Sequence, residues 1–453
     1  MRSRDSYFPR WTLRTEGTIM PDERLPPGQT VVVGLQHVVA MFGATVLAPI
    51  LMGFDPNVSI LFSGIATLIF FAVVGGRVPS YLGSSFAFIG PVLVATGATV
   101  GSPNPNIPVA LGGIIAAGAL YALIGLVVAL AGHRWVERLL PPVVTGAIVA
   151  AIGLVLAPIA INSASGVTPD NQAGSAFARW IALLTVVAVG AVAVYAPGIW
   201  RRLPILIGGA VAYLAYLVLA NGLGFGQPID FSKVAQAAWF GRPNFTSPVF
   251  TAPAISLIAP VAIILVAENL GHIKAIGAMT GRNLDPYLGR AFIGDGIATM
   301  LSGWFGGTGM TTYAENMGVM AVTRIYSTLI FVVAAFIAIL LGFSPKFGAL
   351  IQTIPVPVLG GLSIVVFGLI AATAGRIWVE NGVDFSRPRN LITVAVALVL
   401  GAGNFKLAIG GFTLDGIGTA TFGAIILYHL LGRGEPAAAT RETPRGAVGV
   451  ADV

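Results

Sequence analysis

The sequence predicts an all-α polytopic membrane protein whose fourteen transmembrane segments form a seven-plus-seven inverted repeat. Three observations predict this fold: the composition, the number of long apolar runs and an internal repeat. Hydrophobic residues make up 56% of the 453 residues and charged residues only 9%, whereas soluble domains carry about 25% charged residues. Because this number of charged residues is too small to build a water-soluble surface, the bilayer is the main solvent. The same composition excludes intrinsic disorder.

The 25 basic and 18 acidic residues give a formal net charge of +7, and the chain contains no cysteine. The basic residues recur in short gaps between apolar runs, a distribution that reflects membrane topology and argues against nucleic acid as a partner. Without cysteine, disulfides, Cys-ligated metals, iron–sulfur clusters and thiol nucleophiles are excluded.

A helix that crosses the hydrocarbon core needs about 20 apolar residues, with a range of about 17–25. Fourteen runs are assigned as spans, seven on each side of a polar stretch at 223–252. They are 29–52, 57–75, 84–99, 108–131, 141–161, 178–197, 204–222, 253–280, 287–304, 312–324, 326–344, 355–374, 390–409 and 413–432. Residues 1–28 have no apolar core of their own and are expected to be a tail rather than a cleavable signal peptide, and residues 433–453 are expected to be a disordered tail.

The basic residues between spans predict the orientation. With the N-terminus in the cytoplasm, twelve of them fall on the cytoplasmic side: Arg77, Arg134, Arg138, Arg201, Arg202, Lys274, Arg282, Arg290, Arg324, Arg376, Arg387 and Arg389. Five fall on the other side: Arg179, Lys233, Arg242, Lys346 and Lys406. This excess predicts that both termini are cytoplasmic and that the number of spans is even.

A shift of 215 residues aligns one segment of each half. PVVTGAIVAAIGLVLA (142–157) then matches PVLGGLSIVVFGLIAA (357–372), with identical residues at six positions. Because each half holds an odd number of spans, the halves enter the membrane with opposite orientation, which is typical of secondary transporters. A chance match between Gly- and Ala-rich helices is the alternative.

The spans at 84–99 and 312–324 are short and coincide with the Gly-, Ser- and Thr-rich segments GSSFAFIGP (83–91) and GGTGMTTYAEN (306–316). Irregular backbone at membrane depth is tolerated only where it lines a cavity inside the protein. Half-helices that begin there direct free N–H groups and positive dipole ends toward one point. A polar, electron-rich ligand is therefore predicted at that point.

Several ionisable side chains lie inside the predicted spans, where a charge costs at least about 2.5–3.5 kcal/mol. Glu268 and His272 lie in AENLGH (267–272) and share one helix face. Glu315 lies near the start of 312–324, and His37 lies in 29–52 beside Gln36. These residues are candidates for function.

Structural roles are the alternatives: a buried pair for Glu268 and His272, a helix cap for Glu315 and a hydrogen bond for His37. Asp295 is isolated and expected to be structural. A metal site is not expected, because the chain has only four histidines and no HExxH motif.

A carboxyl group beside an imidazole can take up and release a proton as its exposure changes. This favours proton-coupled transport over a passive channel, which would need a continuous polar stripe, and leaves coupling to sodium open. An intramembrane enzyme is disfavoured because no nucleophile, metal set or phosphate-binding loop accompanies Glu268 and His272.

Four motifs resemble the nucleobase–ascorbate transporters, also called nucleobase–cation symporters. The segment AENMGVMAVTR (314–324) fits the Glu-Asn-x-Gly-x4-Thr-Arg form of that family's signature. The segments GLQHVVAMFGATVLAP (34–49), 83–91 and 267–272 resemble the uracil:proton symporter branch. The resemblance extends over about residues 28–432.

The resemblance implies a core (transport) domain of residues 29–131 and 253–345 and a gate domain of residues 132–222 and 346–432. The gate domain would form a homodimer, and residues 223–252 would be an extracytoplasmic loop. Segments three and ten would each contain a short antiparallel strand followed by a half-helix.

The resemblance also implies a binding site for uracil. Glu268 and Glu315 would accept hydrogen bonds from its ring N–H groups, and the backbone amides of Phe86 and Ala314 would donate to its carbonyls. Ala44 and Tyr313 would line the pocket. His272 would support Glu268 and take part in proton coupling. Further support of the binding site would come from His37, Gln36, Asn316 and Ser85. No cofactor, metal or catalytic residue is implied.

The implied activity is import of uracil by proton symport across the inner (plasma) membrane, with the core domain moving against the gate domain. Purine-type relatives typically have Gln at the position of Glu315, which favours a pyrimidine, with a purine or xanthine permease as the alternative. Uracil-type members often have Gly in place of Ala314 and Pro-Asn in place of Gly309-Met310, which could alter substrate range. An anion transporter of the same architecture, for sulfate or bicarbonate, should have a cationic residue where this chain has two carboxylates.

Overall fold

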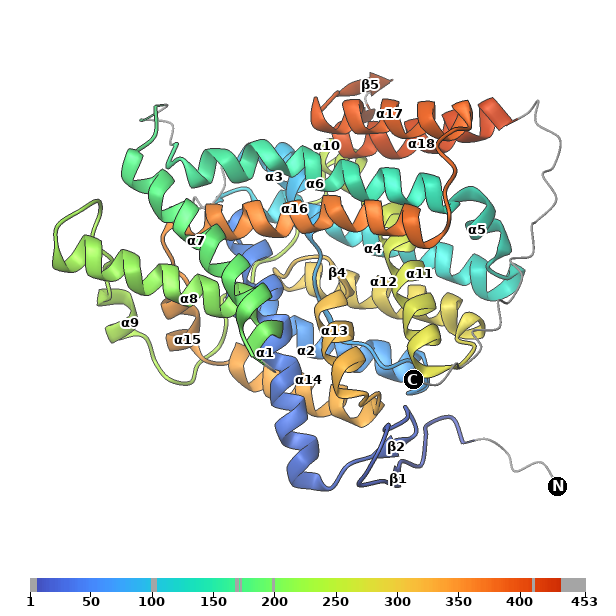
Figure 1. The fold of residues 1–453 in the computed structure, drawn as a ribbon, viewed down its shortest axis with the longest axis horizontal. Coiled ribbons are helices and arrows are strands. Elements are labelled where there is room, and N and C mark those ends of the chain that lie inside the picture. Colours follow the sequence, from blue (N-terminus) through green and yellow to red (C-terminus); the bar gives the residue numbers. More distant parts are fainter. Residues whose placement is uncertain are drawn as a thin grey trace, which may run out of the picture.

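The computed structural model describes residues 6–98, 104–167, 171, 173–197, 200–409 and 412–432 (Figure 1). Within these residues, eight helices are long and apolar enough to cross a membrane, or nine when one bent pair counts as a span. These helices confirm a polytopic helical membrane protein. The count of fourteen spans stays a prediction, and the expected tail at 433–453 lies outside the described residues.

One group of helices packs around α2 (Pro56–Val73) and α4 (Ile107–Ala131). Its other members are α1 (Pro27–Met52), α10 (Ala252–Ile258), α11 (Val261–Thr280), α12 (Leu288–Trp304) and α14 (Thr328–Gly342). A Cβ atom at Gly118 of α4 or Gly296 of α12 would lie closer than 3.0 Å to the backbone of the facing helix. Small residues allow such close packing in membranes, where lipid provides no hydrophobic force between helices.

The second group contains the two repeated segments, α6 (Pro142–Ala164) and α16 (Val356–Glu380), which run side by side across the upper half of Figure 1. Around them pack α7 (Ala176–Tyr195), α8 (Pro204–Leu217), α17 (Pro388–Ala402) and α18 (Gly416–Leu431). A Cβ atom at Gly153 would lie closer than 3.0 Å to the backbone of α16. The two segments that match in sequence are therefore helices in direct contact.

We expect Gly360→Ala to destabilise the second group, because its Cβ atom would overlap the backbone nitrogen of Ala164 in α6. Overpacking of this kind costs about 1–3 kcal/mol, and backbone cannot move aside as a side chain can. Gly368→Ala on the same helix is the control, since its Cβ atom would meet no atom within 4 Å. Thermal unfolding of the purified protein should show a lower midpoint for Gly360→Ala alone. Equal midpoints would contradict the packing described.

Short elements stand in place of full spans at 84–99 and 312–324. They are the strands β3 (Leu82–Ser84) and β4 (Met310–Thr312), the 3₁₀ helix η1 (Phe86–Phe88), and the helices α3 (Ile89–Thr96) and α13 (Ala314–Thr323). The two strands pair antiparallel, and β4 and α13 lie near the middle of the molecule in Figure 1. These elements confirm the expected paired strands, each followed by a half-helix.

The expected span at 390–409 is wrong at its end. Helix α17 ends at Ala402, and the chain then forms the hairpin of β5 (Leu407–Ile409) and β6 (Phe412–Leu414). Asn404 adopts a left-handed conformation with φ of 46°, which is a common way to leave a helix.

Two short helices connect the two groups: α5 (Arg134–Leu139) between α4 and α6, and α15 (Pro345–Ile351) between α14 and α16. Helices α14 and α15 meet at an angle of 86°. Lys274 of α11 holds α5 through Glu137 at 2.9 Å and also binds Asp285 at 2.6 Å. Three further short elements, η2 (Trp200–Arg202), the π-helical turn η3 (Val218–Gly222) and α9 (Ser232–Gln236), lie between α7 and α10, and η4 (Asp285–Tyr287) precedes α12.

The N-terminal segment, residues 7–25, is folded. Its strands β1 (Thr12–Leu13) and β2 (Glu23–Arg24) pair in parallel and lie below α14 and beside the lower end of α1 in Figure 1. Ile19 and Leu25 are buried together with Ile330 of α14. The segment thus shares an apolar cluster with a distant helix, although it contains no apolar run of its own.

Candidate functional site

The pairing of β3 and β4 places both half-helices at one ladder. Leu82 pairs with Thr312, Gly83 with Thr311 and Ser84 with Met310. Two more backbone hydrogen bonds extend the ladder, from Tyr313 N–H to the Tyr81 carbonyl at 3.0 Å and from Ser85 N–H to the Gly309 carbonyl at 2.9 Å. Because the strands are antiparallel, the half-helices begin at opposite ends of this short ladder.

The half-helix after β3 begins at the boundary between the two helix groups. Ser85 caps it, since its Oγ accepts the N–H of Ala87 at 3.3 Å. The half-buried ring of Phe86 packs edge-to-face against Phe367 of α16, with centroids 6.1 Å apart. The N–H of Phe86 lies in the first turn, where helix geometry leaves donors without intrahelical partners.

The other half-helix, α13, begins with Ala314, which is exposed, and Glu315, which is half-buried. Glu268 of α11 is also half-buried and interacts electrostatically with Glu315 and with Asp295 of α12. Among the described residues, no Lys or Arg forms an ion pair with any of these three. The site therefore gathers acidic groups from three helices.

A hydrogen-bond network next to Glu268 in the chain joins side chains of α11, α12, α4 and β4. The ring Nδ1 of His272 bonds Thr312 Oγ1 at 2.8 Å, and that hydroxyl donates to Asn269 Oδ1 at 3.3 Å. Asn269 Nδ2 donates to the Tyr121 hydroxyl at 2.8 Å and also to Asp295 Oδ2. His272 thus contacts β4 directly, and among the described residues it forms no hydrogen bond with Glu268.

The network includes three residues that the sequence alone did not indicate, namely Tyr121, Asn269 and Thr312. Asn269 directly follows Glu268, and Thr312 lies within the polar segment 306–316, so their positions within these two motifs were the available signal. Asp295 was expected to be structural, and it is buried with partners from α4 and α11.

We expect Thr312→Val to weaken substrate binding, because it removes one hydroxyl that forms hydrogen bonds with both His272 and Asn269. A buried polar group left without its partner costs about 1–3 kcal/mol, which corresponds to roughly five- to 100-fold in an equilibrium. The measurement is substrate binding by the purified protein. Thr373→Val is the control, since that exposed hydroxyl bonds only the Leu369 carbonyl of its own helix. Unchanged binding in Thr312→Val would contradict a role for the network.

His37 of α1 holds the first turn of α13. Asn316 Nδ2 donates to the His37 carbonyl at 3.0 Å and contacts the ring Nδ1 at 3.0 Å. The buried ring of His37 also packs against Phe331, with centroids 4.7 Å apart. His37 and Asn316 therefore fix the residue that follows Glu315, while Gln36 is half-buried on the same helix as His37.

Tyr313 is buried and anchors the start of α13. Its hydroxyl donates to the Ser84 carbonyl at 3.0 Å and accepts from Thr45 Oγ1 at 3.1 Å. A Cβ atom at Gly83 would overlap the Tyr313 ring, so glycine allows the ring to lie on β3. Ala44 is buried on α1 beside Thr45.

Within the described residues, no three His, Asp or Glu side chains are grouped as metal ligands would be. Two half-helices begin at one β ladder, and Glu268 interacts electrostatically with Glu315 in the first turn of one of them. Such groups can bind a polar ring, and together with the membrane spans they indicate a transporter.

Comparison with known proteins agrees with this class. The sequence profile of the Permease family matches residues 28–410. The chain is 64% identical over 430 residues to a protein of Escherichia coli (strain K12) named as a pyrimidine permease, RutG. That alignment covers 94% of this chain and 96% of the relative. The chain is 43% identical over 414 residues to the uracil permease of Paenibacillus larvae, with coverage of 90% and 95%.

Among solved structures, the transmembrane domain of the cyanobacterial bicarbonate transporter BicA has a similar fold. The TM-score is 0.61 at 18% identity, and the match covers 87% of this chain and 96% of that domain.

Because of the family profile and the two relatives of high identity, the chain belongs to the nucleobase–ascorbate transporter family, in the branch of the uracil permeases.

Proposed function

We propose that this chain imports uracil by proton symport. The observation that carries the proposal is the pairing of β3 with β4, which places two half-helix N-termini at one ladder, together with the electrostatic interaction of Glu268 with Glu315 beside it. Uracil presents two N–H donors and two carbonyl acceptors on a flat ring. The carboxylates match the donors, and the N–H groups of Phe86 and Ala314 match the acceptors.

The match also provides selectivity. A buried donor or acceptor left unpaired costs about 1–3 kcal/mol, so a base with a different edge binds more weakly. The ring of Phe86 offers an aromatic surface to the base, and Ala44 and Tyr313 complete the wall. A purine or xanthine permease is the second candidate, because the departures from the uracil-type pattern at Gly309-Met310 and Ala314 bear on the substrate range.

The acidic cluster supports proton coupling. Glu268 interacts electrostatically with Glu315 and with Asp295, and among the described residues no Lys or Arg pairs with any of the three. Carboxyl groups that interact can titrate as a unit. His272 joins the cluster through Thr312 and Asn269. We propose that the cluster takes up a proton together with uracil and releases both on the opposite side.

The two helix groups suggest the moving parts. We propose that residues 29–131 and 253–345 form the core domain, and that residues 132–222 and 346–432 form the gate domain of a fourteen-segment, seven-plus-seven inverted repeat. The contact between Phe86 and Phe367 would then lie at the sliding boundary. The protein would lie in the inner (plasma) membrane with both termini cytoplasmic and dimerise through its gate domain.

An anion transporter is disfavoured although BicA carries bicarbonate, because a likeness at 18% identity concerns the fold alone. The site gathers carboxylates, which repel anions, and the relatives of high identity are named as permeases of pyrimidines.

The test is uptake of radiolabelled uracil into proteoliposomes with an imposed pH gradient. We expect saturable accumulation that stops when the gradient collapses and that unlabelled uracil inhibits more strongly than xanthine or sulfate. Accumulation sustained by a sodium gradient alone would refute proton coupling. Stronger inhibition by xanthine would favour the purine alternative, inhibition by sulfate would favour the anion transporter, and transport without saturation would indicate a channel.

A further inference from the structure

The N-terminal segment, residues 7–25, precedes the region matched by the family profile, which begins at residue 28. It nevertheless makes specific contacts with several helices of the first group. The Tyr7 hydroxyl contacts the carbonyls of Ala72 at 2.9 Å and Val73 at 3.0 Å, at the end of α2. Phe8 stacks on Phe71 of the same helix, with centroids 5.5 Å apart. The segment is thereby fixed at one end.

The segment binds the connection between α13 and α14 through its backbone. Ile19 N–H donates to the Arg324 carbonyl at 3.0 Å, and Tyr326 N–H donates to the Ile19 carbonyl at 2.7 Å. Arg324 adopts a left-handed conformation with φ of 54°, which is unfavourable for a non-glycine residue. This conformation ends α13 at the residue whose carbonyl binds Ile19.

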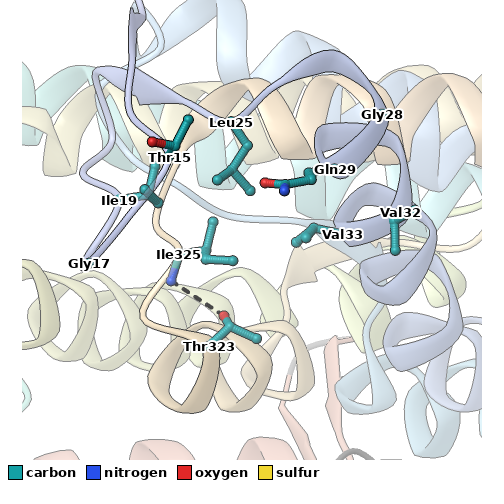
Figure 2. A pocket seen from close by; sticks show the side chains of 10 residues that line it. All are labelled: Thr15, Gly17, Ile19, Leu25, Gly28, Gln29, Val32, Val33, Thr323 and Ile325. Atoms are coloured by element: carbon teal, nitrogen blue, oxygen red, sulfur yellow. Dashed lines mark hydrogen bonds between the residues drawn. The ribbon is translucent and has the colours of Figure 1, made fainter.

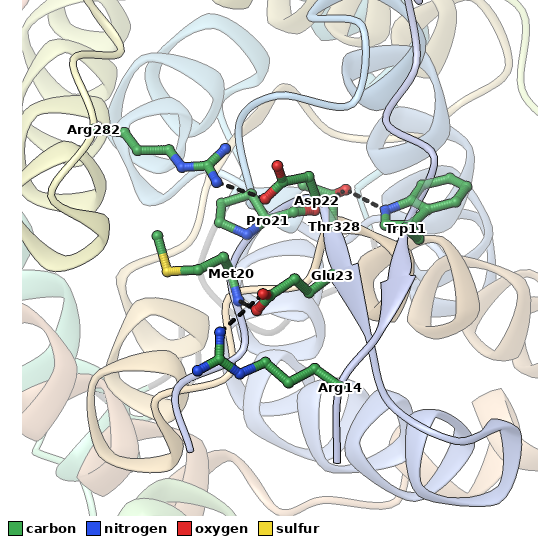
Figure 3. A network of polar contacts seen from close by, with 8 residues as sticks. All are labelled: Trp11, Arg14, Met20, Pro21, Asp22, Glu23, Arg282 and Thr328. Carbon is green, nitrogen blue, oxygen red and sulfur yellow. Dashed lines mark hydrogen bonds and ion pairs between the residues drawn. The ribbon is translucent and has the colours of Figure 1, made fainter. Parts of the chain in front are cut away.

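Thr328, the first residue of α14, adds a side-chain contact (Figure 3). Its Oγ1 donates to the Pro21 carbonyl at 3.0 Å and accepts from Trp11 Nε1 at 3.0 Å. Both partners belong to the N-terminal segment. Thr328 and Ile330, which is buried against Ile19 and Leu25, therefore hold the segment on α14.

The segment also binds the end of α11. Asp22 Oδ1 and Arg282 Nη2 form an ion pair at 2.5 Å (Figure 3), and Arg282 directly follows Gly281, which caps α11. Helix α11 carries Glu268, and α13 carries Glu315. One segment therefore connects the far ends of the two helices whose carboxylates form the candidate site.

Helix α13 has few other restraints. Only Asn316, Val319 and Met320 are buried on it, and Val322 near its end is 56% exposed. Its first turn is held by β4 and by His37, whereas its last turn is held by the N-terminal segment. A helix of ten residues is about 15 Å long, so release of its last turn from the N-terminal segment would allow α13 to tilt about its first turn and would reorient Glu315 there.

On the side of α1, the same segment is separated from the helix by an open cavity of about 410 Å³ (Figure 2). Gln29, Val32 and Val33 of α1 line one wall, and Ile19, Thr323 and Ile325 lie across it. The segment is thus bonded to the ends of α11 and α13 and packs more loosely against α1.

We propose that residues 7–25 act as a clasp that fixes α13 relative to α11 and thereby sets the spacing of Glu315 and Glu268. Asp22 of the clasp and its partner Thr328 of α14 are positioning residues, since they act through the helices and lie outside the candidate site. The consequence for uracil affinity rests on the proposed function, whereas the positioning of the two helices does not.

The test measures the distance between α11 and α13 directly. Because the chain has no cysteine, Gly271→Cys and Gly318→Cys introduce two unique labelling sites, and a Cβ atom at either would meet no atom within 4 Å. Spin labels at these positions report the interhelical distance by double electron–electron resonance, without any substrate. Asp22→Asn combined with Thr328→Val removes the ion pair with Arg282 and the hydroxyl that bonds Pro21 and Trp11, and we expect the distance distribution to broaden or shift.

Arg14→Gln is the matched control, because it removes an ion pair with Glu23 that lies wholly inside the segment. Exchange of the charged pair, Asp22→Arg with Arg282→Asp in a chain that retains Thr328, should keep the wild-type distribution. An unchanged distribution in Asp22→Asn with Thr328→Val, or an equal change in Arg14→Gln, would overturn the proposal.

The second readout is transport of the best competitor from the panel of bases. We expect the KM of Asp22→Asn with Thr328→Val to rise about tenfold, with the maximal rate per folded molecule retained. A lower maximal rate with unchanged KM and distance would show a merely structural role and overturn the clasp. If no base is transported by the unmodified protein, the proposed function fails, while the distance measurement still decides the clasp.

Discussion

Replacing Glu315 or Glu268 with Gln should reduce uracil uptake by about 100-fold or more, while the amount of folded protein stays unchanged. Each replacement keeps the size of the side chain, and its amide offers both a donor and an acceptor where the base requires an acceptor. The charge-assisted hydrogen bond, worth about 1.5–3 kcal/mol, is lost, and a buried donor of the base is left poorly paired. A loss of about 3 kcal/mol corresponds to roughly 100-fold.

The comparison should be made on the purified variants in proteoliposomes, with uptake normalised to folded protein. Glu380→Gln is a suitable control, since that exposed carboxylate at the end of α16 pairs only with Arg376 on its own helix. Uptake at the wild-type rate by both Glu315→Gln and Glu268→Gln would refute the assignment of the carboxylates to the site.

The two carboxylates can be separated further by the pH dependence of binding. If they act as one unit with Asp295, removal of either should change how the remaining groups take up protons. Binding of uracil by Glu268→Gln and Glu315→Gln should then respond to pH differently from binding by the intact protein. Identical profiles in all three would mean that the proton is carried elsewhere.

Most long helices could be predicted from the sequence, because an apolar run of sufficient length has few alternatives to a membrane helix. Helices α1, α4 and α6 begin and end within about three residues of the predicted spans. The end of α17 could not be predicted in this way, because Leu407, Ala408 and Ile409 are as apolar as a helix interior. Their pairing as β5 with β6 depends on the turn at Asn404 and on backbone partners.

The N-terminal segment could not be predicted for a different reason. Its partners Arg282 and Thr328 lie more than two hundred residues away in the chain. A periodic pattern in the sequence does not predict a contact over such a distance. The same limit applies to the site. Glu268 and Glu315 were selected because charge in a membrane is costly, whereas Tyr121, Asn269 and Thr312 are polar residues whose importance follows only from their mutual contacts.

The likeness to BicA at 18% identity concerns the fold alone. In this chain two half-helices begin at one β ladder, and helix N-termini attract negative charge or electron-rich atoms. Under the proposed function, the carboxylates of Glu268 and Glu315 beside them favour a neutral base with N–H groups over an anion.

Gly309→Ala is expected to abolish transport, since the geometry of the ladder leaves no room for a side chain there. A Cβ atom at Gly309 would overlap the ring of Phe88, which is fully buried and cannot move aside. The Gly309 carbonyl also accepts the N–H of Ser85, so a shift of this backbone would displace the cap of the half-helix that begins at Phe86. Overpacking costs about 1–3 kcal/mol in stability, yet substrate binding should suffer more, because both half-helices start from this ladder.

The measurement is uracil binding and uptake by folded Gly309→Ala, with Gly375→Ala in α16 as the control, since a Cβ atom at Gly375 would meet no atom within 4 Å. Binding should fall at least tenfold in Gly309→Ala, and an added Phe88→Leu, which removes part of the obstructing ring, should restore some of it. That reversal would not occur if the loss came from a general failure to fold. Full activity in Gly309→Ala would mean that the two strands tolerate displacement, and the half-helices could then not be held in the fixed geometry on which recognition of a small flat base depends.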